Sequence, residues 1–172
     1  KYLLSMLDAG LYEELFERMR TVLPPFFDPE IYGRSTLENS SYIVSSANPD
    51  PELAGRGFVG RLSGAAAEAI TLCLRMFLGD RLFCLDSGEL TFAIEPALPD
   101  WLFREDGTLS FRYLGCRFIY INRSRRNIYG PDSARQARIS CLGLEIPAAC
   151  LPYGLACQLR EKKLEELTVI FE

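Results

Sequence analysis

The first part of the chain carries apolar residues at helical spacing. Within residues 2–22 they recur every three or four positions, and charged residues fill most of the places between them, a pattern typical of an amphipathic helix. Gly10 interrupts the stretch, so we expect a short helical turn before it and a second helix over about 11–22. Pro24 and Pro25 then end the helical pattern.

A second helical pattern covers residues 62–78, where a broad apolar stripe indicates a helix buried on most sides. Ser63 is a candidate N-cap and Gly79 a candidate C′ residue. The small residues Gly64 to Ala67 would let another backbone or a ligand approach this end closely.

Beyond Gly79 the apolar period changes from about 3.6 residues to two, which indicates strands. Residues 155–164 fit a helix as well as a strand. Short strands separated by turns favour an antiparallel β-sandwich, so the sequence predicts an α+β fold. The expected strands are 90–94, 108–113, 116–121, 138–142 and 167–171.

Residues 24–60 form a long connection that is rich in proline and glycine. Only 41–45 has the pattern of a short helix or strand. A loop of this length in a compact domain is usually functional or packed against other structure. Its Leu, Ile, Tyr and Phe content argues against a free linker.

Composition removes several classes of function. The 172 residues carry a net charge of −4, so we expect no nucleic-acid partner. No apolar run reaches about 18 residues, so we expect no membrane span. The chain has no histidine, which excludes Ser-His-Asp and Cys-His nucleophiles and most zinc sites from its own residues.

The six cysteines show no CxxC spacing, which argues against a metal site. Most have apolar neighbours, and this favours buried free thiols in a reducing, cytoplasmic location. The chain begins at Lys1 inside a helical pattern, so we expect it to be part of something longer.

The loop at residues 55–64 is the first candidate site. The start of a helix leaves N–H groups unpaired and carries the positive end of the helix dipole. Gly64 lets an anion approach the backbone, Ser63 can donate its hydroxyl, and Arg56 and Arg61 can add charge-assisted bonds. The alternative is a capped helix whose glycines only serve the turn.

A polar stretch at residues 34–41 is the second candidate. Sugars are bound through such side chains, and Glu38 could accept hydrogen bonds from hydroxyl groups. Turn and capping chemistry explains the same residues equally well. Glycoside chemistry also needs positioned carboxylates, but the spacing of the acidic residues in this connection does not show which of them approach each other.

Several segments together resemble the C-terminal third of the inverting glycoside phosphorylases, the family of cellobiose, chitobiose and β-glucan phosphorylases. The family's Thr/Ser-Gly helix start, Leu-Gly helix end, Gly-x-Leu-x-x-x-Pro-x-Leu/Ile-Pro-x-x-Trp segment and Asn-ended strand have counterparts in that order here, and the counterpart of its Glu-Pro-Tyr segment lies upstream of them. The matching residues are 61–67, Phe77-Leu78-Gly79, Gly88-Glu89-Leu90, 95–101, Leu37 to Tyr42 and Ile121-Asn122.

This resemblance implies that residues 1–79 are the C-terminal end of an (α/α)6 barrel and that 80–172 are a C-terminal β-sandwich. In the family, inorganic phosphate attacks the anomeric carbon of a β-linked glucoside while a carboxylic acid protonates the leaving oxygen. The product is an inverted sugar 1-phosphate, and phosphate is a co-substrate with no further cofactor.

Carried over residue by residue, the resemblance places phosphate on Ser63 and Gly64. It points to Glu38 as a sugar-binding residue, and we add Arg34 and Arg56 as neighbouring cations that would face the sugar. We expect no catalytic residue and no metal ligand within this chain.

Three departures limit the carry-over. Leu62 stands near the place of an aromatic residue, Asn39 replaces the proline after the glutamate, and the phosphate-binding histidine has no counterpart. The family's general acid also lies upstream of Lys1, so this chain would need the missing barrel portion, or a self-associated copy, as its partner. The alternatives are a non-catalytic carbohydrate-binding or assembly module and a remnant of a glycoside hydrolase.

Overall fold

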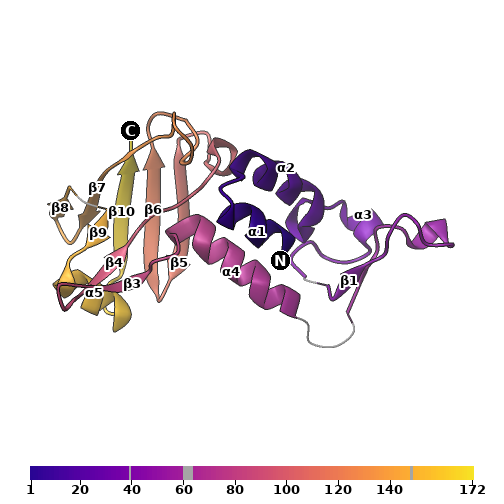
Figure 1. The fold of residues 1–172 in the computed structure, drawn as a ribbon, viewed down its shortest axis with the longest axis horizontal. Helices are drawn as coiled ribbons and strands as arrows, with labels where there is room; N and C mark the ends of the chain where they lie inside the picture. Colours follow the sequence, from indigo (N-terminus) through magenta and orange to yellow (C-terminus); the bar gives the residue numbers. More distant parts are fainter. Residues whose placement is uncertain (39, 60–63, 148) are drawn as a thin grey trace. The chain divides into compact units, whose positions relative to one another are not determined.

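The computed structural model describes residues 1–38, 40–59, 64–147 and 149–172 (Figure 1). The chain divides into two compact units, an N-terminal unit of Lys1–Cys73 and a C-terminal unit of Leu74–Glu172. Helices and short elements make up the first unit, and most strands lie in the second. The α+β class expected from the sequence is confirmed.

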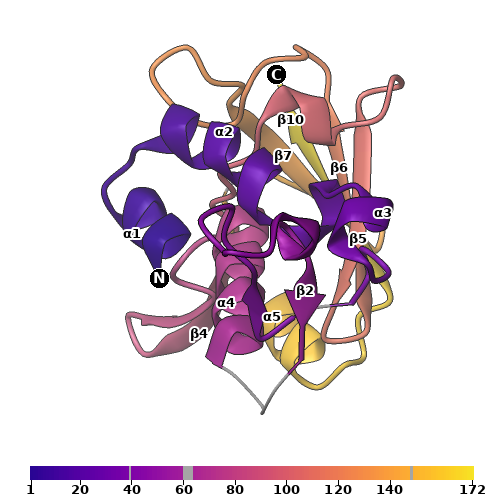
Figure 2. The same ribbon diagram turned by 90° about the vertical axis from the view of Figure 1, so that its right-hand side faces the viewer.

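Two helices open the N-terminal unit. The helix α1 (Tyr2–Asp8) and the helix α2 (Tyr12–Val22) pack against each other, as Figure 1 and Figure 2 both show. Gly10 separates them with a φ of 70°, a conformation that glycine adopts without strain. The predicted break at Gly10 is therefore confirmed. The buried side chains of this pair are Leu3, Leu7, Leu15, Phe16 and Met19.

The long connection contains short elements. Those of the described part are η1 (Pro24–Phe26), α3 (Pro29–Tyr32), β1 (Tyr42–Ile43), η2 (Pro51–Leu53) and β2 (Gly57–Phe58). The strands β1 and β2 pair antiparallel, with Tyr42 opposite Phe58. The expected element at 41–45 is thus a two-residue strand.

The helix α4 (Gly64–Leu78) leads from the first unit into the second. It is followed by Gly79, whose N–H donates to the carbonyl oxygen of Arg75 and whose φ is 97°. A methyl group on Gly79 would lie 2.8 Å from the carbonyl oxygen of Glu95. Glycine is therefore required here, and its predicted role after the helix is confirmed.

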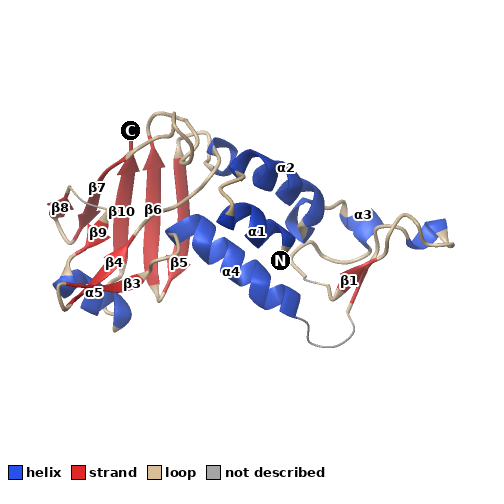
Figure 3. Ribbon diagram, viewed as in Figure 1, coloured by secondary structure: helices blue, strands red, loops and turns tan. Residues whose placement is uncertain are grey.

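The C-terminal unit contains two sheets, drawn in red in Figure 3. The smaller has the order β3-β4-β9, with bounds Phe83–Asp86, Glu89–Ala93 and Cys150–Leu151. The larger has the order β5-β6-β10-β7-β8, with bounds Thr108–Tyr113, Cys116–Asn122, Glu166–Phe171, Gln136–Cys141 and Leu144–Ile146. The unit also holds η3 (Asp100–Leu102) and α5 (Tyr153–Arg160).

The larger sheet is mixed, which corrects the antiparallel expectation. The strand β10 runs parallel to β6, from Glu166 opposite Arg117 to Phe171 opposite Asn122. Parallel neighbours need a crossover connection, and the chain between them supplies β7 to β9 and α5. The ambiguous stretch 155–164 contributes to that crossover as helix α5, which packs on β4.

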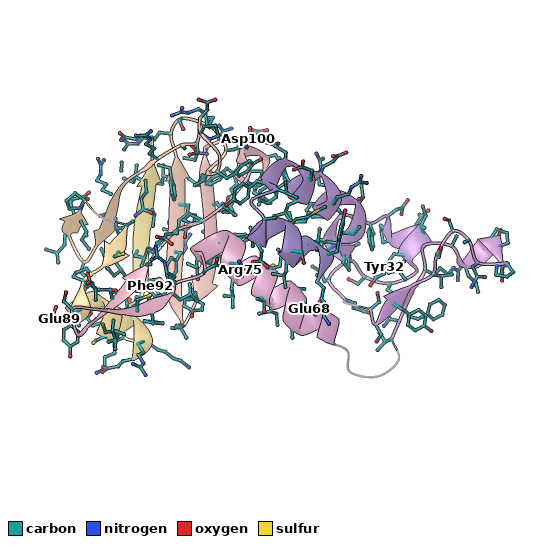
Figure 4. The ribbon with its side chains drawn as sticks, viewed as in Figure 1. Tyr32, Glu68, Arg75, Glu89, Phe92 and Asp100 are labelled. Carbon is teal, nitrogen blue, oxygen red and sulfur yellow. The ribbon has the colours of Figure 1, made fainter. Side chains whose placement is uncertain are left out.

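Aromatic rings make up much of the core of the C-terminal unit. Phe92 on β4 is fully buried, and Figure 4 labels it. Its ring centroid lies 4.8 Å from that of Phe83, 6.0 Å from that of Tyr113 and 6.2 Å from that of Phe118. Phe92 therefore joins the smaller sheet to the strands β5 and β6 of the larger one.

Tyr120 ties the sheet to the end of α4. Its hydroxyl donates to the carbonyl oxygen of Phe77 at 2.6 Å, and carbonyls in the last turn of a helix lack partners within the helix. Complete burial raises the pKa of the Tyr120 hydroxyl well above its usual value, so this donor keeps its proton.

We expect Tyr120→Phe to lower the free energy of unfolding by about 1–3 kcal/mol, because it leaves the part-buried Phe77 carbonyl without this donor. Urea denaturation measures the loss. Tyr113→Phe, a half-buried tyrosine on the neighbouring strand, is the matched control. Equal losses in the two variants would show that the Phe77 carbonyl does not need this bond.

Candidate functional site

Tyr32, at the end of α3, organises the long connection. Its side chain is 1% exposed, and its hydroxyl donates to the carbonyl oxygen of Glu38 at 3.0 Å (Figure 4). Its ring also meets that of Phe27 edge to face, with centroids 5.4 Å apart. The polar stretch is therefore fixed to a buried aromatic residue.

Two glycines of the predicted anion-binding loop pack against α3. A methyl group on Gly57 would lie 2.7 Å from Cζ and 2.8 Å from Cδ2 of Tyr32. Gly55 has a φ of 82°, and a methyl group there would lie 2.8 Å from Cγ2 of Ile31. These positions favour the alternative in which the glycines serve packing and the turn.

Arg34 and Glu38 come together as the polar stretch folds into a turn. Nη2 of Arg34 lies 2.9 Å from Oε2 of Glu38. The turn is closed by the hydrogen bond from the Glu38 N–H to the Ser35 carbonyl oxygen and by the one from the Leu37 N–H to the Ser35 hydroxyl. Both charged side chains are partly exposed, so the pair adds little stability, and Nε of Arg34 is buried without a hydrogen-bond partner among the described residues.

Arg56 directly precedes the strand β2. Its backbone carbonyl accepts from the N–H of Val44 at 3.0 Å, and its side chain is exposed. Among the described residues, no hydrogen bond or ion pair joins Arg56 to Arg34 or Glu38. The structure thus brings two of the three expected sugar-binding residues together.

The expected phosphate site is described only in part. Gly64 is the first described residue of α4. Ser63 and Arg61 lie outside the described residues. Phosphate binding at Ser63 and Gly64 stays a prediction.

Sequence reasoning missed an exposed aromatic pair next to the polar turn. The rings of Tyr42 and Phe58 are nearly parallel, at 12°, with centroids 5.6 Å apart. Tyr42 is 56% exposed and Phe58 is 36% exposed. The N–H of Ser41 donates to the Phe58 carbonyl at 2.8 Å, which joins the pair to the polar stretch. We call Tyr42 and Phe58 the aromatic platform.

The platform and the polar turn have complementary chemistry. An exposed aromatic face offers an apolar surface on which the C–H groups of a sugar ring can stack. The carboxylate of Glu38 accepts hydrogen bonds and the guanidinium of Arg34 donates them. Together they suit a polyhydroxylated ring better than a purely apolar or purely charged ligand.

A separate hollow of about 340 Å³ in the same unit is mainly apolar. It is lined by residues of α1 and α4 and by the end of α2, with Lys1 and Glu68 as its charged side chains. This composition offers a sugar fewer hydrogen bonds than the platform and turn do.

The cysteines are free thiols, but their burial varies. Cys116 and Cys141 are buried, whereas Cys73 and Cys150 are exposed. The described residues contain no group of three or more Cys, Asp or Glu side chains placed to hold a metal ion. Among the described helices, none combines the length and the hydropathy needed to cross a bilayer.

Comparison with known proteins assigns no family. No protein-family model matches the chain, and no curated protein matches it.

Proposed function

We propose that the chain is the C-terminal part of a carbohydrate-active enzyme of the glycoside phosphorylase type, and that its N-terminal unit binds the sugar of a β-linked glucoside. The observation that carries this proposal is the exposed platform of Tyr42 and Phe58, whose strand β2 packs at Gly57 on Tyr32, the residue that also bonds the Glu38 carbonyl. A contiguous exposed apolar patch can mark a binding surface, and the face of a sugar ring is a suitable cover for it.

In this proposal the polar turn gives orientation and the platform gives affinity. Glu38 accepts hydrogen bonds from sugar hydroxyls, Arg34 holds its carboxylate in place, and Arg56 approaches the sugar or its phosphate from the far end of β2. The buried Tyr32 supports the turn through its bond to the Glu38 carbonyl. The site is thus pre-organised, which lowers the entropic cost of binding.

Phosphate is the proposed co-substrate, bound at the start of α4 by Ser63 and Gly64. A helix of 15 residues presents unpaired N–H groups and a favourable dipole at that end. Phosphorolysis with inversion would then yield a sugar 1-phosphate. The general acid and the rest of the barrel would come from the missing portion of the same enzyme or from a self-associated copy.

The wider architecture belongs to the same proposal. Residues 1–79 would be the end of an (α/α)6 barrel and 80–172 a β-sandwich. The contacts of Phe92 with rings of the larger sheet support the second assignment. Free thiols in the described structure support a reducing, cytoplasmic setting.

Isothermal titration of the chain with cellobiose tests the sugar site. We expect Tyr42→Ala to weaken binding by at least tenfold, which corresponds to about 1.4 kcal/mol, because the platform loses half its stacking surface. Tyr2→Ala removes an equally exposed tyrosine from α1 and serves as the control. Equal affinity in the two variants would contradict the proposal.

The main alternative is a non-catalytic carbohydrate-binding or assembly module, which the same platform favours. Phosphate distinguishes the two. The enzyme proposal expects phosphate binding that Ser63→Ala removes, whereas a module would bind cellobiose with no phosphate at that helix start.

A further inference from the structure

Two arginines face each other across the β5–β6 pair of the C-terminal unit. Arg112 on β5 stands directly opposite Arg117 on β6, and both are exposed. Residues opposite each other in an antiparallel pair project from the same face, and like charges there destabilise the pair. An anion bound between the two guanidinium groups would relieve this repulsion.

A third cation and a hollow lie at the same place. A hollow of about 620 Å³ is lined by Arg112, Gly115, Arg117, Lys162, Leu164, Glu165 and Glu166. Nη1 of Arg112 donates to the Gly115 carbonyl at 3.1 Å, which holds the guanidinium beside the β5–β6 turn. Lys162 follows α5 with a φ of 60°, in a conformation that favours glycine. Lys162 adds its charge to the lining of the hollow.

The acidic residues nearby neutralise this charge incompletely. Glu166 on β10 stands opposite Arg117 on β6. Nη1 of Arg117 lies 3.5 Å from Oε2 of Glu166, and both side chains are about half exposed. Such pairs contribute little. Among the residues that the structure describes, no ion pair involves Arg112 or Lys162. The lining of the hollow therefore carries three cationic side chains and two carboxylates.

We propose that this hollow binds a phosphate group, either inorganic phosphate or the phosphate of a small monoester. Guanidinium groups match the oxygens of phosphate with two parallel hydrogen bonds, and an ammonium group adds a compact charge. The site lies wholly within the C-terminal unit and uses no residue of the proposed sugar site or of the α4 helix start. It can therefore exist whether or not the proposed function is correct.

The test is amide chemical-shift mapping of the full chain in low salt, with inorganic phosphate in one arm and phenyl phosphate in the other. We expect saturable shifts at 112–117 and 162–166. Tighter binding of phenyl phosphate would identify a monoester as the natural ligand, and equal or weaker binding the free anion. Shifts at 64–67 would report the separate site at α4, and Ser63→Ala would remove only those.

Two variants make the result decisive. Arg112→Thr should weaken binding at 112–117 by about tenfold or more, because it removes a charge-assisted contact, and it should leave the phosphate-free protein at least as stable. Arg138→Thr removes an arginine of the same sheet that pairs with Glu145 at 2.9 Å, and it should bind phosphate as the wild type does. No shifts at 112–117 with either probe, or equal affinities of the two variants, would overturn the proposal.

Discussion

Phe92→Ala should lower the unfolding free energy of the C-terminal unit by about 3–5 kcal/mol, the largest loss that we expect from a single substitution in this protein. The side chain is fully buried, and its ring contacts those of Phe83, Tyr113 and Phe118. Removing it leaves a cavity where β4 meets β5 and β6, and rigid neighbouring rings can fill such a space only in part.

Urea denaturation followed by tyrosine and tryptophan fluorescence measures this loss. Leu85→Ala is the control, because Leu85 lies on the adjacent strand β3 and is 75% exposed. We expect the control to change stability by less than about 0.5 kcal/mol. A Phe92→Ala variant as stable as the control would contradict the description of the two sheets as joined through this ring.

Gly57→Ala should destabilise the N-terminal unit by about 1–3 kcal/mol, in the range measured for overpacked cores. The added methyl group would lie 2.7 Å from Cζ of Tyr32, whose ring is buried and whose hydroxyl is held by the Glu38 carbonyl. The ring cannot move away without breaking that bond. We therefore expect the variant to bind cellobiose more weakly as well, because the polar turn and β2 shift together.

Gly154→Ala is the matched control for this change. Gly154 lies in α5, and a methyl group there would meet no atom within 4 Å. Alanine suits a helix better than glycine, so the control should be neutral or slightly stabilising. Denaturation of the two variants side by side gives the comparison, and a fully stable Gly57→Ala protein would mean that Tyr32 does not need this glycine.

Local patterns predicted the secondary structure where the period was clear. The break at Gly10, the end of α4 at Gly79 and the alternation in β5 all depend on neighbours in sequence. The parallel pairing of β10 with β6 is different, because it joins strands about 50 residues apart and no local period reports it. The antiparallel expectation failed at that pair for this reason.

In the candidate site, too, the sequence could group residues that are close along the chain but not those that strand pairing brings together. Arg34 and Glu38 belong to one polar turn, so sequence reasoning could group them. The aromatic platform depends on the register of two-residue strands far apart in the chain, which no pattern showed. Two short apolar runs within the long connection, 41–45 and 57–59, were the available signal. The Arg112–Arg117 pair likewise becomes visible only with the register.

The measurement that tests the central claim most directly is amide chemical-shift mapping of the chain titrated with cellobiose. The account predicts saturable shifts gathered at 34–44 and 56–59, around the aromatic platform and the polar turn, and their loss in Tyr42→Ala. No shifts, or shifts confined to the C-terminal unit, would contradict the assignment of the sugar site to this platform.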